Sequence, residues 1–451
     1  MRRDSLWFHP DFRRLWAGDT ISQFGQSAGR TALPLLAATV LLASPFQMGL
    51  LTAAGNAAFL VLGLPAGVWV DRMRRRPLMM AADLTRAALL LTVPAAWWAG
   101  VLGLTQLIVV TLLVGVGTLF FDVAYQSYLP ALVSRAQLVE GNAKLQASQS
   151  ISQIAGPGMA GGLTQLLGAA NTVLTTGAGY LASALFLWRI KAVEPEPEPK
   201  RTDQGGHIGE AGEPTRELGD RNGGHGDRKG EHGGGGLRAG IAEGLRFVFG
   251  SPTLRAITLC TASSNFFSGS FLAVEILFFT GNLRLSPAGV GLLLAAGGIG
   301  GVLGATSVGW WIRRAGQVRT IWLICVVTFP AVLLLPLAAP GWAVVLAPIG
   351  LVFFGYGVVV YNVAQVSYRQ TVCPDGLLGR MNASVRFVVW GVTPLGGLLG
   401  GALGEWIGVH ATVWVTMLGQ NAAILPLLFS PLRTMRDLPS SASNDEPAAL
   451  T

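Results

Sequence analysis

Charge is scarce in this 451-residue sequence. Asp, Glu, Lys and Arg make up 12% of the chain, whereas soluble domains carry about 25%, and 51% of the residues are apolar. So little charge excludes an ordinary soluble domain. The composition indicates a protein that crosses a membrane several times.

Cysteine and histidine are also rare. The three cysteines lie far apart, without the spacing of a disulfide framework or a zinc site, so we interpret them as packing residues. They are Cys260, Cys325 and Cys373. Three of the five histidines, His207, His225 and His232, lie in one Gly-rich segment and are interpreted as solvated side chains. We therefore expect no metal site and no cofactor.

The sequence lacks the motifs of two other classes of membrane protein, ATP-driven pumps and enzymes. No GxxxxGK[ST] phosphate-binding loop is present, which argues against an ATP-driven pump. The apolar ranges contain no grouping of nucleophile and base and no metal cluster, so we expect no enzyme. The net charge of +8 would suit nucleic acid, but its distribution follows membrane topology, so no nucleic-acid partner is expected.

Twelve apolar ranges reach the ~20 residues that an α-helix needs to cross the hydrocarbon core. They lie near residues 16–42, 46–70, 77–99, 103–127, 142–167, 170–190, 254–280, 287–312, 319–338, 342–366, 381–406 and 410–431. Lys and Arg gather in alternate loops, and on the opposite side only one loop is positively charged, through Arg284. By the positive-inside rule, this alternation predicts that both termini are cytoplasmic.

The two halves of the chain are similar in sequence. Laying Ser44 on Ser286 aligns SPFQMGLLTAAG with SPAGVGLLLAAG, and laying Gly115 on Gly355 aligns GVGTLFFDVAYQSY with GYGVVVYNVAQVSY. We predict an all-α polytopic fold of twelve transmembrane helices in two parallel, pseudo-symmetric six-helix bundles, a design of secondary transporters. The predicted parts are a bundle at 1–191, a disordered cytoplasmic linker at 192–250, a bundle at 251–434 and a cytoplasmic tail at 435–451.

Several stretches resemble one transporter family. GVWVDRMRRR, which begins at Gly67, resembles the loop signature of the major facilitator superfamily, and AGPGMAGG resembles its antiporter signature. With FRRLWAGDTISQFG, FDVAYQSYLPALV and LVEGNAKLQ, the chain most resembles the branch of efflux carriers that includes macrolide exporters and the enterobactin exporter. The resemblance covers both halves and excludes the linker and the tail.

The resemblance implies a gate on the cytoplasmic side. Asp71 would hold that side shut against the start of the range at 381–406, where Arg380 is a neighbour. The residues assigned to this gate are Gly67, Asp71, Arg72, Arg75, Arg76, Asp83, Arg86 and Arg380. The alternatives are that the loop arginines only set topology and that Asp83 and Arg86, three residues apart, pair with each other on one helix.

A Gly-rich stretch in the fifth range has a physical role of its own. Gly156, Gly161 and Gly162 allow another backbone to come close, and Pro157 removes one helical hydrogen bond. The resemblance implies a bend that governs leakage and the direction of transport. A purely structural packing face is the alternative.

Ionisable groups inside the spans suggest a polar pathway. Asp19, Gln23, Gln26 and Arg30 lie on one helical face, and Arg30 would cost about 3 kcal/mol in lipid. We therefore expect Arg30 to face a wet cavity or a partner, either an anionic substrate group, Glu275 or Asp122; a structural ion pair is the alternative. The candidates for the cavity wall are Gln23, Gln26, Arg30, Gln146, Gln153, Ser264, Ser268 and Asn362.

Three carboxylates are candidates for proton coupling. Glu275 is the only one in its span, and a carboxyl group removed from water retains its proton more readily, as a proton carrier requires. Asp122 and Asp19 are rivals that no sequence feature separates. Many members of the resembled branch carry an acid where this chain has Gln26, which weakens the case for coupling through the first span.

These observations favour a secondary active efflux transporter, a proton antiporter that exports drugs, antibiotics or related amphiphilic metabolites by alternating access. The alternatives are a lipid or lysolipid translocator on the same scaffold and a siderophore exporter. The expected partners are a small-molecule substrate, protons and the lipid bilayer. We expect a monomer in the plasma membrane.

Overall fold

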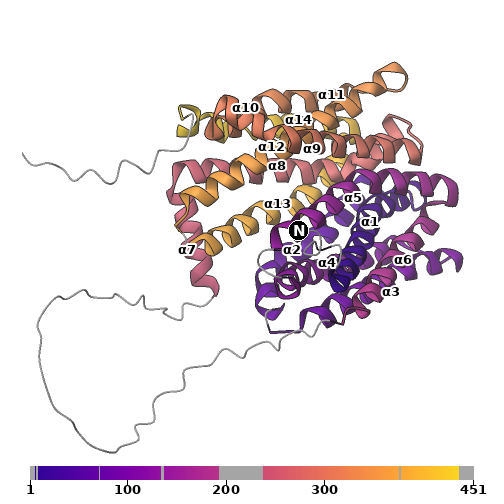
Figure 1. Cartoon of the computed structure of the whole chain (residues 1–451). Helices are drawn as coiled ribbons and strands as arrows, with labels where there is room; N and C mark the ends of the chain where they lie inside the picture. The colour runs from indigo at the N-terminus through magenta and orange to yellow at the C-terminus, as the bar shows by residue number, and fades with distance from the viewer. Residues whose placement is uncertain are drawn as a thin grey trace, which may run out of the picture.

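The computed structural model describes residues 6, 9–70, 72–133, 137–191, 237–374 and 377–435. These ranges fold into helices and contain no β-strand. Figure 1 shows the helices of the first half, in indigo to magenta, gathered beside those of the second half, in rose through orange to yellow. The all-helical class predicted from the sequence is confirmed for these ranges.

The first half contains six long helices. They are α1 (Pro10–Thr39), α2 (Pro45–Val70), α3 (Arg75–Trp98), α4 (Leu104–Leu132), α5 (Leu138–Leu167) and α6 (Ala169–Trp188). The start of α1 follows local chemistry, because Pro10 occupies the first turn and the backbone N–H of Phe12 donates to Nδ1 of His9, 3.1 Å away.

The second half has shorter and more interrupted helices. They are α7 (Leu237–Gly250), α8 (Pro252–Leu277), a π-helical turn (Phe278–Asn282), α9 (Pro287–Ala315), α10 (Gln317–Thr328), a 3-10 turn (Phe329–Leu333), α11 (Leu334–Leu337), a 3-10 turn (Trp342–Val345), α12 (Leu346–Val372), α13 (Leu378–Ile407), α14 (Val409–Ala422), α15 (Leu425–Leu428) and a 3-10 turn (Pro431–Arg433). The predicted ranges 319–338 and 410–431 are each interrupted, near Pro330 and Pro426, because proline lacks the N–H that a continuous helix uses.

Nine helical stretches of the described ranges are long and apolar enough to cross a membrane. The protein is therefore a multi-pass membrane protein. Helices α1, α5 and α6 are long enough but are not among the nine. Charges in α1 and glutamines in α5 lower their hydropathy, and these polar residues line the site described below.

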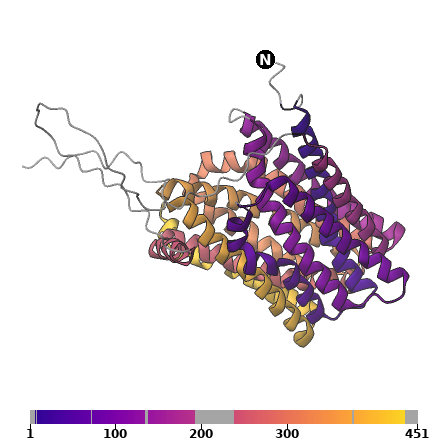
Figure 2. The ribbon, with the colours of Figure 1, turned by 90° about the horizontal axis from the view of Figure 1, so that it is seen from below.

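The helices pack mainly within each half. In the first half α1 contacts α5 and α6, and α4 contacts α2 and α3; in the second half α8 contacts α13 and α14, and α12 contacts α9 and α10. Two helix pairs, α2 with α13 and α5 with α9, make the main contacts between the halves. Figure 2 shows the same arrangement from below.

Both helix pairs meet most tightly at the same end of the molecule. A methyl group added to Gly49 of α2 would lie 2.8 Å from Cα of Gly401 in α13, and one added to Gly161 of α5 would lie 2.8 Å from Cα of Gly291 in α9. Only glycine allows backbones to come so close. We call this end the closed end.

The buried apolar residues follow the same division. At the closed end one cluster contains residues of both halves, among them Leu36, Met48 and Phe278. At the opposite end the two halves have separate clusters, one around Met79 and Leu129 and the other in the second half. The halves therefore share a core at the closed end only, within the described ranges.

Helix α7 lies in a range that was predicted to be disordered. The prediction for 192–250 is wrong for Leu237–Gly250, because these residues form a helix that packs on α13. Gly244 allows the contact, since a methyl group there would lie 2.6 Å from the carbonyl oxygen of Arg380. Val248 is buried in the apolar cluster of the second half. Residues 192–236 lie outside the described residues.

Candidate functional site

Three cavities of about 290 Å³ each follow one another through the protein. The amide cavity lies between α1, α4 and α5. The middle cavity lies between helices of the first half and also touches Leu272 of α8. The Glu275 cavity lies in the second half and shares Leu272 with the middle cavity. Gln26 and Arg30 line both the amide and the middle cavity, so the three spaces form a series.

The amide cavity is lined almost entirely by polar side chains. Helix α1 contributes Gln23, Gln26, Ser27 and Arg30, α4 contributes Asp122, Tyr125 and Gln126, and α5 contributes Asn142, Gln146, Gln149, Ser152 and Gln153. On α5 the amides recur at helical spacing, which puts them on one face. Five of the predicted cavity residues thus come together here.

Most of these side-chain amides are not hydrogen-bonded to other described residues of the protein. The side-chain amides of Gln26, Asn142, Gln146, Gln149 and Gln153 make no hydrogen bond to another described residue. None of the five is buried, since Asn142, Gln146 and Gln153 are exposed and Gln26 and Gln149 are half-buried. The amide cavity therefore presents donors and acceptors that water or a bound molecule can use.

Arg30 faces the cavities, as expected from its cost in lipid. Its side chain is exposed within the protein and makes no ion pair with a described residue. Asp122, which also lines the amide cavity, is close enough to interact electrostatically with Arg30. Asp122 is therefore the proposed carboxylate partner that lies near Arg30. Glu275 lies in a different cavity.

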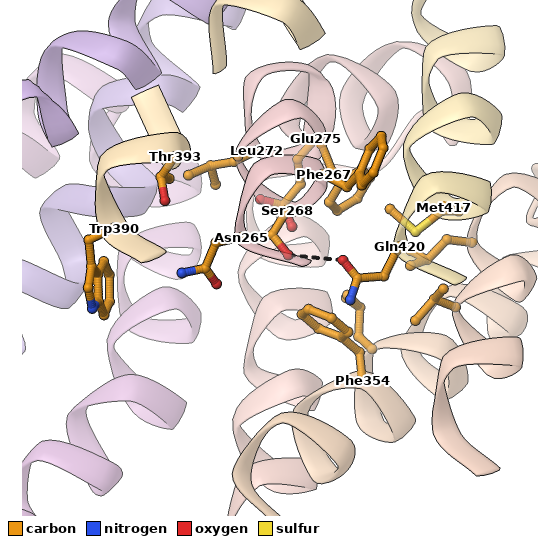
Figure 3. A pocket seen from close by; sticks show the side chains of 15 residues that line it. Asn265, Phe267, Ser268, Leu272, Glu275, Phe354, Trp390, Thr393, Met417 and Gln420 are labelled. Carbon is orange, nitrogen blue, oxygen red and sulfur yellow. Dashed lines mark hydrogen bonds between the residues drawn. The ribbon is translucent and has the colours of Figure 1, made fainter. Parts of the chain in front are cut away.

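Glu275 lies in a largely apolar cavity of its own (Figure 3). It is 8% exposed, and no described residue pairs with it. The lining includes Phe267, Phe354, Trp390 and Met417. Since a lone carboxylate in such surroundings lacks compensation, a functional role is the default interpretation.

The polar side chains around the Glu275 cavity bond to one another. The amide nitrogen of Gln420 donates to Oγ of Ser264, 2.6 Å away, and Ser268 donates to the amide oxygen of Gln420 at 3.5 Å (Figure 3). Asn265 donates to the carbonyl oxygen of Val389 at 2.9 Å. Of the predicted residues, Ser268 lines this cavity and Ser264 supports it.

Two predicted residues lie away from the three cavities. Asn362 on α12 is exposed, accepts a hydrogen bond from Gln365 at 3.4 Å and lines none of these three spaces. Asp19 is 2% exposed, beside Gln23 and Tyr125, and it lines none of the three. Asp19 therefore reaches a cavity only through those neighbours.

Sequence reasoning missed several lining residues. Asn142 and Gln126 continue the helical spacing that begins at Gln146 and Asp122, so a longer window on each helix would have found them. Asn265, Gln420 and Trp390 had no comparable signal, because their helices meet only in the folded protein.

Asp83 and Arg86 form a buried ion pair on α3. Both side chains are at most 1% exposed. The guanidinium carbon of Arg86 lies 4.6 Å from the ring centre of Phe121 and 4.2 Å from that of Tyr180, which adds cation–π attraction. The structure therefore shows the intrahelical pair that the sequence offered as the alternative, and a part for these two residues in the gate stays a prediction.

The loop arginines differ in their contacts. Arg76 donates to the carbonyl oxygens of Leu187 and Trp188, at 2.9 and 2.6 Å, and so caps the end of α6. Arg72 is exposed, and the space beside Gly67 is empty. Asp71 lies outside the described residues.

Two further gate residues lie on different halves, Arg75 on α3 and Arg380 on α13. Arg380 forms an ion pair with Glu243 of α7, with both side chains about half exposed. Arg75 lies at the start of α3. Among the described residues, no hydrogen bond or ion pair joins Arg380 to Arg72, Arg75 or Arg76.

The glycines of the fifth helix face different neighbours. Gly156 packs on Ser27 of α1, and Gly161 packs on Gly291 of α9. Gly162 has no atom within 4 Å of the position of an added methyl group. Pro157 lies inside α5. The stretch therefore joins two helix contacts, one within the half and one between the halves.

Comparisons with known proteins decide the family. Residues 15–394 match the sequence profile of the Major Facilitator Superfamily. The chain belongs to this superfamily. It is 28% identical to the "Multidrug efflux pump Tap" of Mycolicibacterium fortuitum, over 85% of this chain and 88% of that protein. It is 26% identical to the "Enterobactin exporter EntS" of Escherichia coli O127:H6, over 83% of this chain and 80% of that protein.

Solved structures of other transporters share the fold. The nucleoside transporter NupG superposes with a TM-score of 0.70 at 10% identity, covering 93% of this chain and 98% of that one. A bacterial homologue of the iron transporter ferroportin in the inward-facing state gives 0.71 at 14% identity, covering 93% and 98%. The predicted family is confirmed, and its efflux relatives are membrane transporters.

Proposed function

We propose that this protein is a secondary active efflux transporter of the plasma membrane that exports small amphiphilic compounds by alternating access, in exchange for protons. It works as a monomer and is not an enzyme. The relatives at similar length, a multidrug efflux pump and an exporter, support the direction of transport.

The proposed architecture is twelve spans in two six-helix bundles. Helices α1, α5 and α6 complete the nine apolar spans, because each packs among helices that cross the membrane. The first bundle is 1–191 and the second is 251–434, with α7 as an added helix before the second bundle. Their similar sequences support a pseudo-symmetric pair.

The observation that carries the proposal is that the halves join at one end and separate at the other. The basic residues Arg72, Arg76, Arg313 and Arg433 lie at the separated end, which is therefore assigned to the cytoplasm. The glycine contacts at Gly49 and Gly161 then close the outer side. This is the inward-facing arrangement in which an exporter takes up its cargo.

The Glu275 carboxyl is the proposed coupling group. It lines a cavity, is 8% exposed and has no described partner, so a proton could neutralise it, or a substrate cation pair with it, without breaking a structural bond. Asp122 and Asp19 remain rival proposals, although both lie near other charged groups.

The test is accumulation of a panel of antibiotics, siderophores and cationic dyes in a host that lacks its own efflux pumps. Wild type should lower accumulation, and an uncoupler should abolish the effect. Gly401→Leu, which obstructs the outer contact, should be inactive, while Ala402→Leu on the adjacent exposed position should be active. If the protein is expressed but lowers the accumulation of no compound in the panel, the efflux proposal fails, and lipid translocation is the next activity to assay.

A further inference from the structure

We propose that the amide cavity is a subsite for a polyhydroxylated headgroup, such as a glycosyl group, whose apolar body extends through the middle cavity toward Trp390. This inference rests on the proposed function and names the class of substrate. The candidates are therefore glycosylated or similarly hydroxylated amphiphiles.

The first argument is the inventory of the amide cavity. Side-chain amides offer donors and acceptors at the same time, as hydroxyl groups do. Those of Gln146, Gln149 and Gln153 lie on one face of α5 and make no hydrogen bond to another described residue. A sugar with hydroxyl groups on every side can bond to several of them together.

The second argument is electrostatic. The described lining of the amide cavity contains one cation, Arg30, and one carboxylate, Asp122, which interact electrostatically. Asp122 attracts a cationic headgroup that Arg30 repels, and Arg30 attracts an anionic headgroup that Asp122 repels, so a charged headgroup of either sign meets opposing interactions. A neutral headgroup rich in acceptors avoids both repulsions and can still accept hydrogen bonds from Arg30.

The third argument is the contrast with the Glu275 cavity. There the amides of Asn265 and Gln420 already bond to protein atoms, at 2.9 and 2.6 Å, and the remaining wall is mostly apolar. A hydroxylated group would gain little in that cavity. An apolar or aromatic body gains by leaving water.

The cavities are joined in a way that suits one elongated molecule. Phe59 lines the middle cavity and Trp390 lines the Glu275 cavity, and their rings stack across the two halves with centres 6.4 Å apart. Leu272 lines both cavities. Each space of about 290 Å³ is at the lower limit of drug-sized pockets, ~300 Å³, so only the series holds a whole amphiphile.

The test is equilibrium binding of naphthyl β-glucoside and of free naphthol to the full chain in lipid nanodiscs. Wild type should prefer the glucoside. Gln149→Leu and Gln153→Leu should each weaken glucoside binding about five-fold, the value of one net hydrogen bond, and leave naphthol binding unchanged. Gln106→Leu removes an amide that lines none of the three cavities and should change neither.

Unchanged naphthol binding also demonstrates that the variants are folded. Equal weakening of both ligands, or no preference of wild type for the glucoside, would overturn the subsite. A glucoside that binds as expected in a protein that exports nothing would retain the subsite and reject the proposed function. Export of other compounds by a protein that does not bind the glucoside would retain the proposed function and reject the subsite.

A glycosyl headgroup can come from a soluble compound or from a membrane glycolipid. Nanodiscs that contain glucosyl diacylglycerol separate the two sources. Displacement of naphthyl glucoside by this lipid supports the subsite and identifies a lipid source, while undiminished binding supports the subsite and identifies a soluble one.

Discussion

Gly161 of α5 and Gly291 of α9 meet backbone to backbone, so that a methyl group on Gly161 would lie 2.8 Å from Cα of Gly291. The pair Gly49 and Gly401 repeats this relationship between α2 and α13. Two glycine contacts, each between one helix of the first half and one of the second, therefore hold the halves together at the closed end.

Gly161→Val should open the closed end. The larger side chain cannot fit against α9, and overpacking costs about 1–3 kcal/mol, which changes a two-state ratio by roughly 5- to 150-fold. Distances between spin labels on the outer ends of α5 and α9 should lengthen. Gly162→Val is the matched control, because open space surrounds that position. Identical distances in both variants would contradict the role of the contact.

Arg86→Met should destabilise the first half strongly. The change leaves the Asp83 carboxylate buried without its partner, which costs about 3–5 kcal/mol. The midpoint of thermal unfolding of the purified protein measures the effect. Glu243→Gln breaks a half-exposed pair worth about 0–1 kcal/mol and serves as the control. Equal midpoints would mean that the buried pair contributes little.

Glu275→Gln should uncouple transport from the proton gradient. The amide retains the shape of the side chain but cannot exchange a proton, so substrate binding should persist while pH-driven accumulation in everted vesicles is lost. Glu405→Gln, at an exposed carboxylate near the closed end, should behave like wild type. Normal pH-driven transport by Glu275→Gln would move the proposal to Asp122 or Asp19.

Asp71→Asn should weaken closure of the cytoplasmic side, if Asp71 is the gate residue that the family resemblance implies. A cysteine placed at Gln153 in the amide cavity should then react faster with a thiol reagent added from the cytoplasm. The three native cysteines are buried, which lowers the background. Asp11→Asn makes the same charge change at the same end and is the control. Unchanged reactivity would refute the gate.

Periodicity predicted much of the fold and one wall of the site. Gln23, Gln26 and Arg30 on α1, and Gln146 and Gln153 on α5, were predicted because residues at helical spacing share a face whatever that face meets. The helical ranges were likewise predicted from apolar length, which the bilayer imposes on each helix separately.

Contacts between side chains of different helices could not be predicted from the sequence. Nothing local indicated that Arg76 would cap α6, that Glu243 would pair with Arg380, or that Gln420 would bond to Ser264. Each depends on which helix faces meet after packing. Helix α7 was missed because a Gly-rich stretch precedes it, and its stability comes from docking on α13.

The docking of α7 decides how tension along the chain is distributed. The segment that links the halves enters the second half at Leu237, and α7 lies against the first turns of α13, at Arg380 and Ser384. A force on that segment therefore acts on α13, through its contact with α7, as well as on α8, which follows α7 in the chain. Because α13 continues as a helix past Pro394 to Ile407, a displacement of its first turns can be carried along one element to Gly401, where the two halves touch.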